Sequence, residues 1–134
     1  MFSKFLDKNI DLGLLVLRVS IGGLMVLHGI KKISADISFI KELVVKIGLP
    51  VFTSYGVFLG ELIAPIMILI GYKTRFASLI FFLTCLFIIF VAHPSDIFKL
   101  NEYGGWQLEL VGLYAFGSLA LMFAGGGKYA ITKE

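Results

Sequence analysis

Ionisable side chains inside apolar stretches are the residues of this sequence most able to do chemistry. Arg18, Glu61 and Glu109 each lie among mostly apolar neighbours. A charge in the middle of a membrane costs about 2.5 to 3.5 kcal/mol on insertion scales, so it normally pairs or faces a polar cavity. Residue counting puts Arg18 and Glu61 within reach of each other across two helices. We therefore expect an Arg18–Glu61 ion pair, serving either a functional site or only the cohesion of the bundle.

A second polar group is expected at the other ends of the same stretches. His28 and His93 end two stretches that run in the same direction, Lys32 follows His28 by one helical turn, and Glu109 opens the last stretch. Such a cluster could bind an anion, relay protons or hydrogen-bond a quinone carbonyl. The alternative is that these residues only anchor helix ends at the interface. We expect a ligand or proton site, because Glu109 lies inside its apolar stretch.

The supply of possible ligands disfavours metal and haem. The chain has two histidines and one cysteine, Cys85, so no disulfide, CxxC pair or cysteine metal cluster can form within it. We expect no metal site and disfavour haem, which leaves a quinone as the cofactor that the cluster could hold. A quinone also needs an apolar wall, for which Met25, Tyr103 and Trp106 are candidates. The sequence assigns no catalytic residue.

Membrane-spanning helices must position these side chains, because the composition fits no water-soluble fold. Of the 134 residues, 58% are hydrophobic and 16% are charged, and the mean hydropathy is +0.95. A small globule cannot hide that much apolar surface from water. Disordered, nucleic-acid-binding and secreted disulfide-rich proteins are thereby excluded as leading classes. The lipid bilayer is the first partner to expect.

Four apolar stretches approach the ~20 residues that a spanning helix needs. They are residues 12–30, 51–72, 75–92 and 106–124. The remainder is too short for a separate soluble domain, so we predict one transmembrane domain over residues 1–134. The predicted fold class is all-α, an integral membrane four-helix bundle. Stripes of small residues, Gly22 with Gly29 and Gly56 with Gly60, predict close helix contacts, with a homo-oligomer as the alternative.

Residues 31–50 predict a short amphipathic helix at the membrane interface. Its apolar residues recur at helical spacing, whereas charged residues occupy the rest of the helical wheel. The apolar positions are Ile37, Ile40, Val44 and Ile47.

Four spans place both termini on one side of the plasma (inner) membrane. The turn at residues 71–74 and the start of the next span carry Lys73 and Arg75, whereas the later loop at residues 93–105 carries only Lys99. Because basic residues favour the cytoplasmic side, we expect both termini in the cytoplasm.

Several segments together resemble the DoxX family of small four-helix membrane proteins. They are LRVSIGGLMVLHGIKKI, IGLP, GELIAP, GYKTRFAS and the acidic residue that opens the last stretch. The resemblance spans nearly the whole chain and implies that the family's polar positions fall on Arg18, His28, Gly29, Lys32, Glu61, Arg75 and Glu109. It also implies a link to quinol oxidase and thiosulfate:quinone oxidoreductase subunits, and to membrane complexes that handle oxidative and thiol stress. Distant relatives act as membrane chaperones or cargo receptors.

Two functions follow from these observations. The first is a subunit of, or accessory to, a quinone-linked membrane oxidoreductase complex, in which other membrane or redox proteins supply the redox centres. The second is a non-enzymatic membrane scaffold, chaperone or assembly factor. The sequence leaves open whether the chain is an enzyme and names no substrate.

Overall fold

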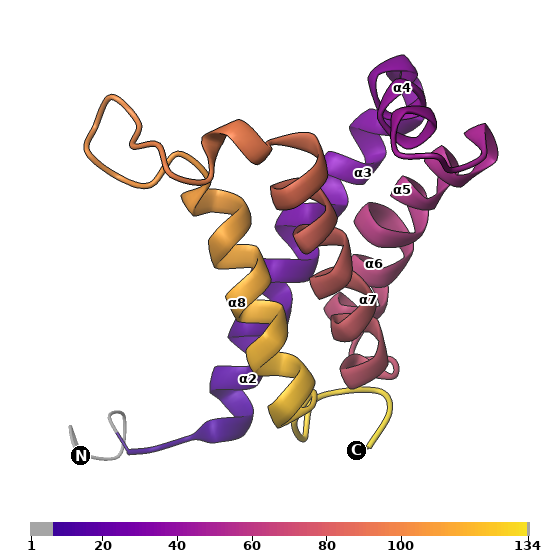
Figure 1. Ribbon diagram of the computed structural model, residues 1–134. Helices are drawn as coiled ribbons and strands as arrows, with labels where there is room; N and C mark the ends of the chain where they lie inside the picture. Colours follow the sequence, from indigo (N-terminus) through magenta and orange to yellow (C-terminus); the bar gives the residue numbers. More distant parts are fainter. Residues whose placement is uncertain (1–6, 134) are drawn as a thin grey trace.

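The described part of the molecule is built mainly from four helices, and three of them contain a π-helical turn. The computed structural model describes residues 7–133, which contain no β-strand and form an all-helical bundle (Figure 1). Helix one consists of α2 (Ile10–Arg18), the π-helical turn η1 (Val19–Gly23) and α3 (Leu24–Ser34). Helix two consists of the 3-10 turn η2 (Val51–Tyr55), α5 (Gly56–Phe58), the π-helical turn η3 (Leu59–Ile63) and α6 (Ala64–Ile70). Helix three consists of α7 (Thr74–Phe87) and the π-helical turn η4 (Ile88–Ala92), and helix four is α8 (Glu109–Ala124). The predicted all-helical membrane fold is confirmed.

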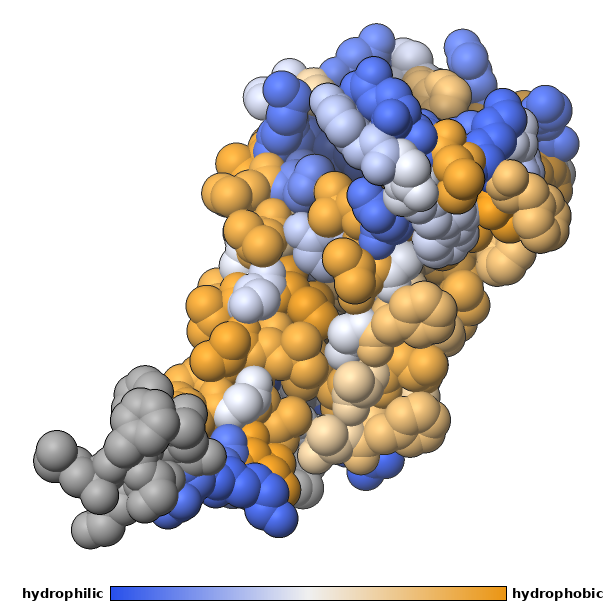
Figure 2. Space-filling model, turned by 90° about the vertical axis from the view of Figure 1, so that its left-hand side faces the viewer, coloured by the Kyte–Doolittle hydropathy of each residue, from blue (hydrophilic) through white to orange (hydrophobic). Residues whose placement is uncertain are grey.

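Three of these helices are long and apolar enough to cross a membrane. They contain 25, 20 and 19 residues, whereas α8 is a shorter apolar helix of 16 residues. Helix one continues four residues beyond its predicted end, and α8 begins three residues after its predicted start. Figure 2 shows a hydrophobic belt between hydrophilic surfaces at the two ends of the molecule. The belt is the surface expected of a protein that faces lipid at mid-height.

The expected short helix between helices one and two is present as α4 (Ser38–Lys46). It packs against η2 and buries Val44, while Phe39 and Val45 are more than half exposed. α4 and the loop at residues 93–108 lie at the same end of the bundle, opposite the start of α2 and the end of α8 (Figure 1). We call the first end the α4 end and the second the terminal end.

Glycine lets helices one and two approach each other backbone to backbone. A Cβ atom added to Gly22 would lie 2.6 Å from the Pro65 carbonyl oxygen, and one added to Gly29 would lie 2.3 Å from the Glu61 carbonyl oxygen. Real Cβ atoms do not approach backbone that closely, so only glycine fits at either position. The predicted role of Gly22 and Gly29 in helix contact is confirmed.

Pro65 explains why helix two widens into a π-helical turn. Proline lacks the N–H that would bond the carbonyl four residues earlier, and its ring collides with that carbonyl in a regular helix. Here that carbonyl belongs to Glu61, in the turn η3 directly before α6. π-helical turns are frequent at functional sites, and this one carries a buried carboxylate.

Candidate functional site

Arg18 belongs to the terminal end of the bundle and pairs with carbonyl groups rather than with Glu61. Its side chain is 1% exposed, and its guanidinium donates hydrogen bonds to four carbonyl oxygens at 3.0 to 3.4 Å. These belong to Ile68, Leu69, Gly126 and Tyr129. The last carbonyls of a helix lack partners within it and carry the negative end of its dipole, so a cation stabilises them.

The predicted Arg18–Glu61 ion pair is therefore wrong. The carbonyls of Ile68 and Leu69 lie seven to eight residues beyond Glu61, about 11 Å along the helix at 1.5 Å per residue. The Arg18 side chain reaches the last turn of helix two, at the terminal end of the bundle, and not the middle of that helix, where Glu61 lies. Residue counting gave the depth of the two α-carbons but could not give the direction of the arginine side chain.

Glu61 pairs with Lys32 at the opposite end. The Lys32 ammonium donates a hydrogen bond to Glu61 Oε2, and the exposed fractions of the two side chains are 33% and 6%. Gly29 holds α3 against the backbone of η3, which brings Lys32, one turn later, beside the carboxylate. An unpaired carboxylate buried to this degree would be costly, so the ion pair with Lys32 stabilises the folded bundle.

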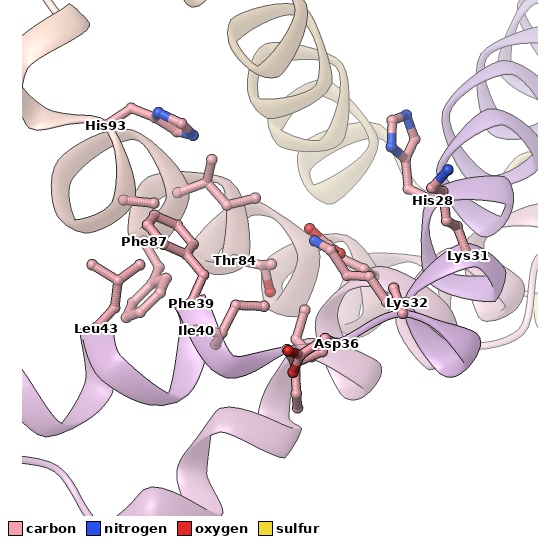
Figure 3. A pocket seen from close by; sticks show the side chains of 16 residues that line it. His28, Lys31, Lys32, Asp36, Phe39, Ile40, Leu43, Thr84, Phe87 and His93 are labelled. Atoms are coloured by element: carbon pink, nitrogen blue, oxygen red, sulfur yellow. The ribbon is translucent and has the colours of Figure 1, made fainter.

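A cavity of about 380 Å³ opens beside this ion pair (Figure 3). It lies between α3, α4, helix two and the end of helix three. Its polar lining includes His28, Lys32, Glu61 and His93, with the two histidines on opposite sides. Its apolar lining includes Phe39, Ile40, Leu43, Phe87 and Ile88. The volume is within the roughly 300 to 1,000 Å³ of small-molecule sites, as is the pattern of apolar walls with a few polar groups.

A second cavity of about 410 Å³ meets the first at His28, Glu61, Ile88 and His93. It also includes Asp96 and Gln107 from the loop at the α4 end. His93 Nδ1 lies 3.6 Å from Asp96 Oδ2, and the His28 ring packs edge to face against Tyr114. Both histidines thus border both cavities, between the loop and the buried Glu61 carboxylate.

Asp36 at the rim of the first cavity is held in its ionised form. Ser38 donates hydrogen bonds to its Oδ1 from the side-chain hydroxyl at 2.6 Å and from the backbone N–H at 2.9 Å. These hydrogen bonds lower the pKa of the fully solvent-exposed Asp36 carboxyl below its ordinary value. Asp36 therefore adds a fixed negative charge beside Lys32 rather than a proton that can be exchanged near neutral pH.

The structure brings together three of the four residues of the predicted second cluster. His28, Lys32 and His93 line one cavity, but Glu109 does not. Glu109 is exposed and its Oε1 accepts a hydrogen bond from Asn101 Nδ2 at 3.2 Å. Including Glu109 was wrong, because no residue of helix four lines the first cavity. Glu61 provides the carboxylate in its place.

The predicted apolar wall is correct for one of its three residues. Met25 lines the second cavity. Trp106 instead donates from Nε1 to the Ile97 carbonyl at 2.6 Å within the loop, and Tyr103 is 88% exposed. The α4 residues of the wall were missed, although the amphipathic pattern that predicted α4 also marked Ile40 as apolar.

The described residues hold no group of three or more histidine, cysteine or acidic side chains placed to bind a metal ion. Cys85 is fully buried within the hydrophobic core. What the site offers is hydrogen-bond donors from Lys32 and the histidines, an acceptor from Glu61, and an apolar wall. This set fits an amphiphilic molecule with a polar head.

Comparison with known proteins agrees with this architecture. The sequence model of the DoxX family matches residues 13–94. The chain is 32% identical over 112 residues to the protein named "Putative oxidoreductase CatD" from Bacillus subtilis (strain 168), covering 81% of each chain. No solved structure matches. The matched region includes every residue that lines the first cavity and ends before Glu109. The chain belongs to the DoxX family.

Proposed function

We propose that this chain binds a membrane quinone in the first cavity, as a subunit of or accessory to a quinone-linked membrane oxidoreductase complex. The observation that carries the proposal is the arrangement of polar and apolar side chains in this cavity. The Lys32–Glu61 pair and two histidines line it, and most of its other lining residues are apolar. A quinone needs both, apolar surface for burial and a few directed polar groups for orientation. The relative named an oxidoreductase supports the same class of reaction.

The residues of the chain would orient the head group and deliver protons. The Lys32 ammonium and an imidazole N–H can each donate a hydrogen bond to a carbonyl oxygen, and Glu61 keeps the ammonium in place. A bound quinone would supply the electron-accepting carbonyls, and its reduction to a quinol consumes two electrons and two protons. The second cavity offers the protons a route from Asp96 and Gln107 past His93 to Glu61.

The electrons are assigned to a partner protein. The chain contains one cysteine, which cannot form the dithiol of a thiol-linked reductase by itself. A redox partner in or on the same membrane would therefore complete the reaction. Whether this chain is counted as an enzyme depends on that complex, since its own residues bind, orient and protonate.

Binding of a tail-less benzoquinone analogue to the purified protein in lipid nanodiscs tests the proposal. We expect Lys32→Met to weaken binding by about 10- to 100-fold, because a hydrogen bond to a charged group contributes about 1.5 to 3 kcal/mol. The matched control is Lys99→Met, whose side chain is 61% exposed on the loop and lines neither cavity.

His28→Ala provides a second variant, because its side chain is exposed to the cavities and its loss should leave folding intact. We expect His28→Ala to weaken binding of the tail-less analogue as well. Wild-type protein that does not bind the analogue would refute the proposal, as would equal binding by Lys32→Met, His28→Ala and the control. A quinone-free protein that co-purifies with another membrane protein would then favour the scaffold function.

A further inference from the structure

A third hollow adjoins the first cavity along α4. It is a groove of about 340 Å³ between α4, the start of helix two and α7. It shares the lining residues Ile40, Thr84 and Phe87 with the first cavity, so the two hollows are neighbours. The first cavity has polar side chains beside Glu61, whereas the groove has no charged side chain.

The side chains of the groove offer a ligand no free hydrogen-bond donor. Apart from Gly56, its lining residues are apolar or threonine. Thr84 Oγ1 donates to the Ile80 carbonyl at 2.9 Å, and Thr53 Oγ1 donates to the Pro50 carbonyl at 2.6 Å. Both hydroxyls are therefore engaged by their own helices, and their methyl groups remain as contact surface. Such a surface suits a hydrocarbon chain and gives no affinity to a polar ligand.

The far end of the groove opens to the lipid-facing surface of helix three. Leu83 lines the groove and is 51% exposed, within a helix apolar enough to span the membrane. Gly56 leaves a gap in the opposite wall, where an added Cβ atom would meet nothing within 4 Å. The groove thus lies between the first cavity, which holds the Lys32–Glu61 pair, and the lipid-facing surface of helix three.

We propose that this groove holds the hydrocarbon tail of the ligand whose head group lies in the first cavity, and that the ligand enters sideways from the membrane. The inference rests on the proposed function for its head group and adds a tail subsite formed by Gly56, Thr84 and Leu83. The three lining residues that groove and cavity share favour this occupant over a separate lipid chain, because one amphiphile could occupy both hollows at once. The ligand class is therefore a lipid-soluble quinone with a long apolar tail.

Photocrosslinking with two probes tests the tail subsite in nanodiscs. The first probe is a benzoquinone with an alkyl tail that carries a diazirine, and the second is a phospholipid with the same diazirine in an acyl chain. We expect the first probe to label Thr53, Ile80 and Leu83, and excess tail-less quinone to reduce that labelling by competing for the head site. The phospholipid probe should label these residues less and should not respond to the competitor.

Gly56→Leu should then reduce labelling of the groove by about tenfold, because its side chain would fill the volume that the tail needs. Binding of the tail-less analogue should stay within about twofold of the wild type, since the head site is untouched. Gly13→Leu is the matched control, as its added Cβ also meets nothing within 4 Å but it lies on α2. Leu83→Trp is a second variant that narrows the groove and should also reduce its labelling. Leu83 is already exposed to lipid, so this variant should fold even if Gly56→Leu disturbs the start of helix two.

The outcomes separate the two proposals. If the tail-less analogue binds but the tailed probe labels helix three and α8 indiscriminately, the tail subsite is refuted and the head site stands. Equal, competitor-insensitive labelling by the phospholipid probe identifies the groove as a general lipid contact and also refutes the subsite. If neither quinone binds, the proposed function fails and the tail subsite fails with it.

Discussion

At the scale of single residues, Arg18 and Glu61, the two buried charged side chains among residues 7–133, are neutralised in different ways. Arg18 is surrounded by backbone carbonyls, whereas Glu61 depends on one partly exposed lysine. The arginine site is closed and joins the ends of α6 and α8. The carboxylate site borders two cavities. Only the second arrangement is open to a ligand.

The unequal exposure of the Lys32–Glu61 pair predicts unequal effects of removing its partners. Lys32→Met should lower the free energy of unfolding by about 3 kcal/mol, because it leaves a buried carboxylate unpaired. Glu61→Gln should cost less, because the free Lys32 ammonium is 33% exposed and can turn toward water. Thermal unfolding in one detergent measures both. The double variant should recover part of the loss, and additive losses would contradict a direct interaction.

Arg18→Lys should destabilise the bundle although it keeps the charge. A lysine ammonium cannot reproduce the planar fork that reaches carbonyls of both α6 and the segment after α8. We expect a lower melting temperature with unchanged affinity for the tail-less quinone, since the site is at the other end. A variant that loses quinone affinity while keeping its melting temperature would show that Arg18 acts on the cavity.

At the scale of helices, the position of the site depends on the close contact between α3 and η3. Gly29→Ala should destabilise by about 1 to 3 kcal/mol, the usual cost of overpacking, because its Cβ would overlap the Glu61 carbonyl. Gly23→Ala is the control, as its added Cβ would lie at ordinary contact, 3.8 Å from Leu69 Cδ1. Thermal unfolding should separate the two. Equal melting temperatures of Gly29→Ala and Gly23→Ala would mean that α3 and η3 can move apart without loss of stability.

Helix positions could be predicted from the sequence, but the pairing of side chains across helices could not. The lengths of apolar runs define spans, and the pattern of Ile37, Ile40 and Val44 defines α4, because both follow from burial along one helix. The partners of Arg18 and Glu61 depend on how helices one and two rotate and how close Gly29 lets them come. Those are properties of two helices at once. His28 and His93 were predicted together because parallel helices of similar length end at similar depth.

At the scale of the whole molecule, the orientation in the membrane is a prediction that cysteine labelling can test. Tyr72→Cys lies in the turn before α7 and Tyr103→Cys in the loop before α8, and both positions are exposed. We expect a membrane-impermeant maleimide to reach only Tyr103→Cys from outside intact cells. The native Cys85 is fully buried and serves as an unreactive background. Labelling of Tyr72→Cys from outside would place both termini outside.

The short length of α8 has a consequence for the surrounding lipids. Its 16 residues rise about 24 Å, whereas the hydrocarbon core of a typical bilayer is about 30 Å thick. Hydrophobic mismatch of this kind is relieved by thinning the bilayer locally, at a fraction of a kcal/mol per Å. Helix one, with 25 residues, meets the opposite problem and is expected to tilt. The lipids around the protein should therefore be unevenly distributed, with short-chain phospholipids enriched beside α8. The thickness of the bilayer should set the tilt of the bundle relative to the membrane normal.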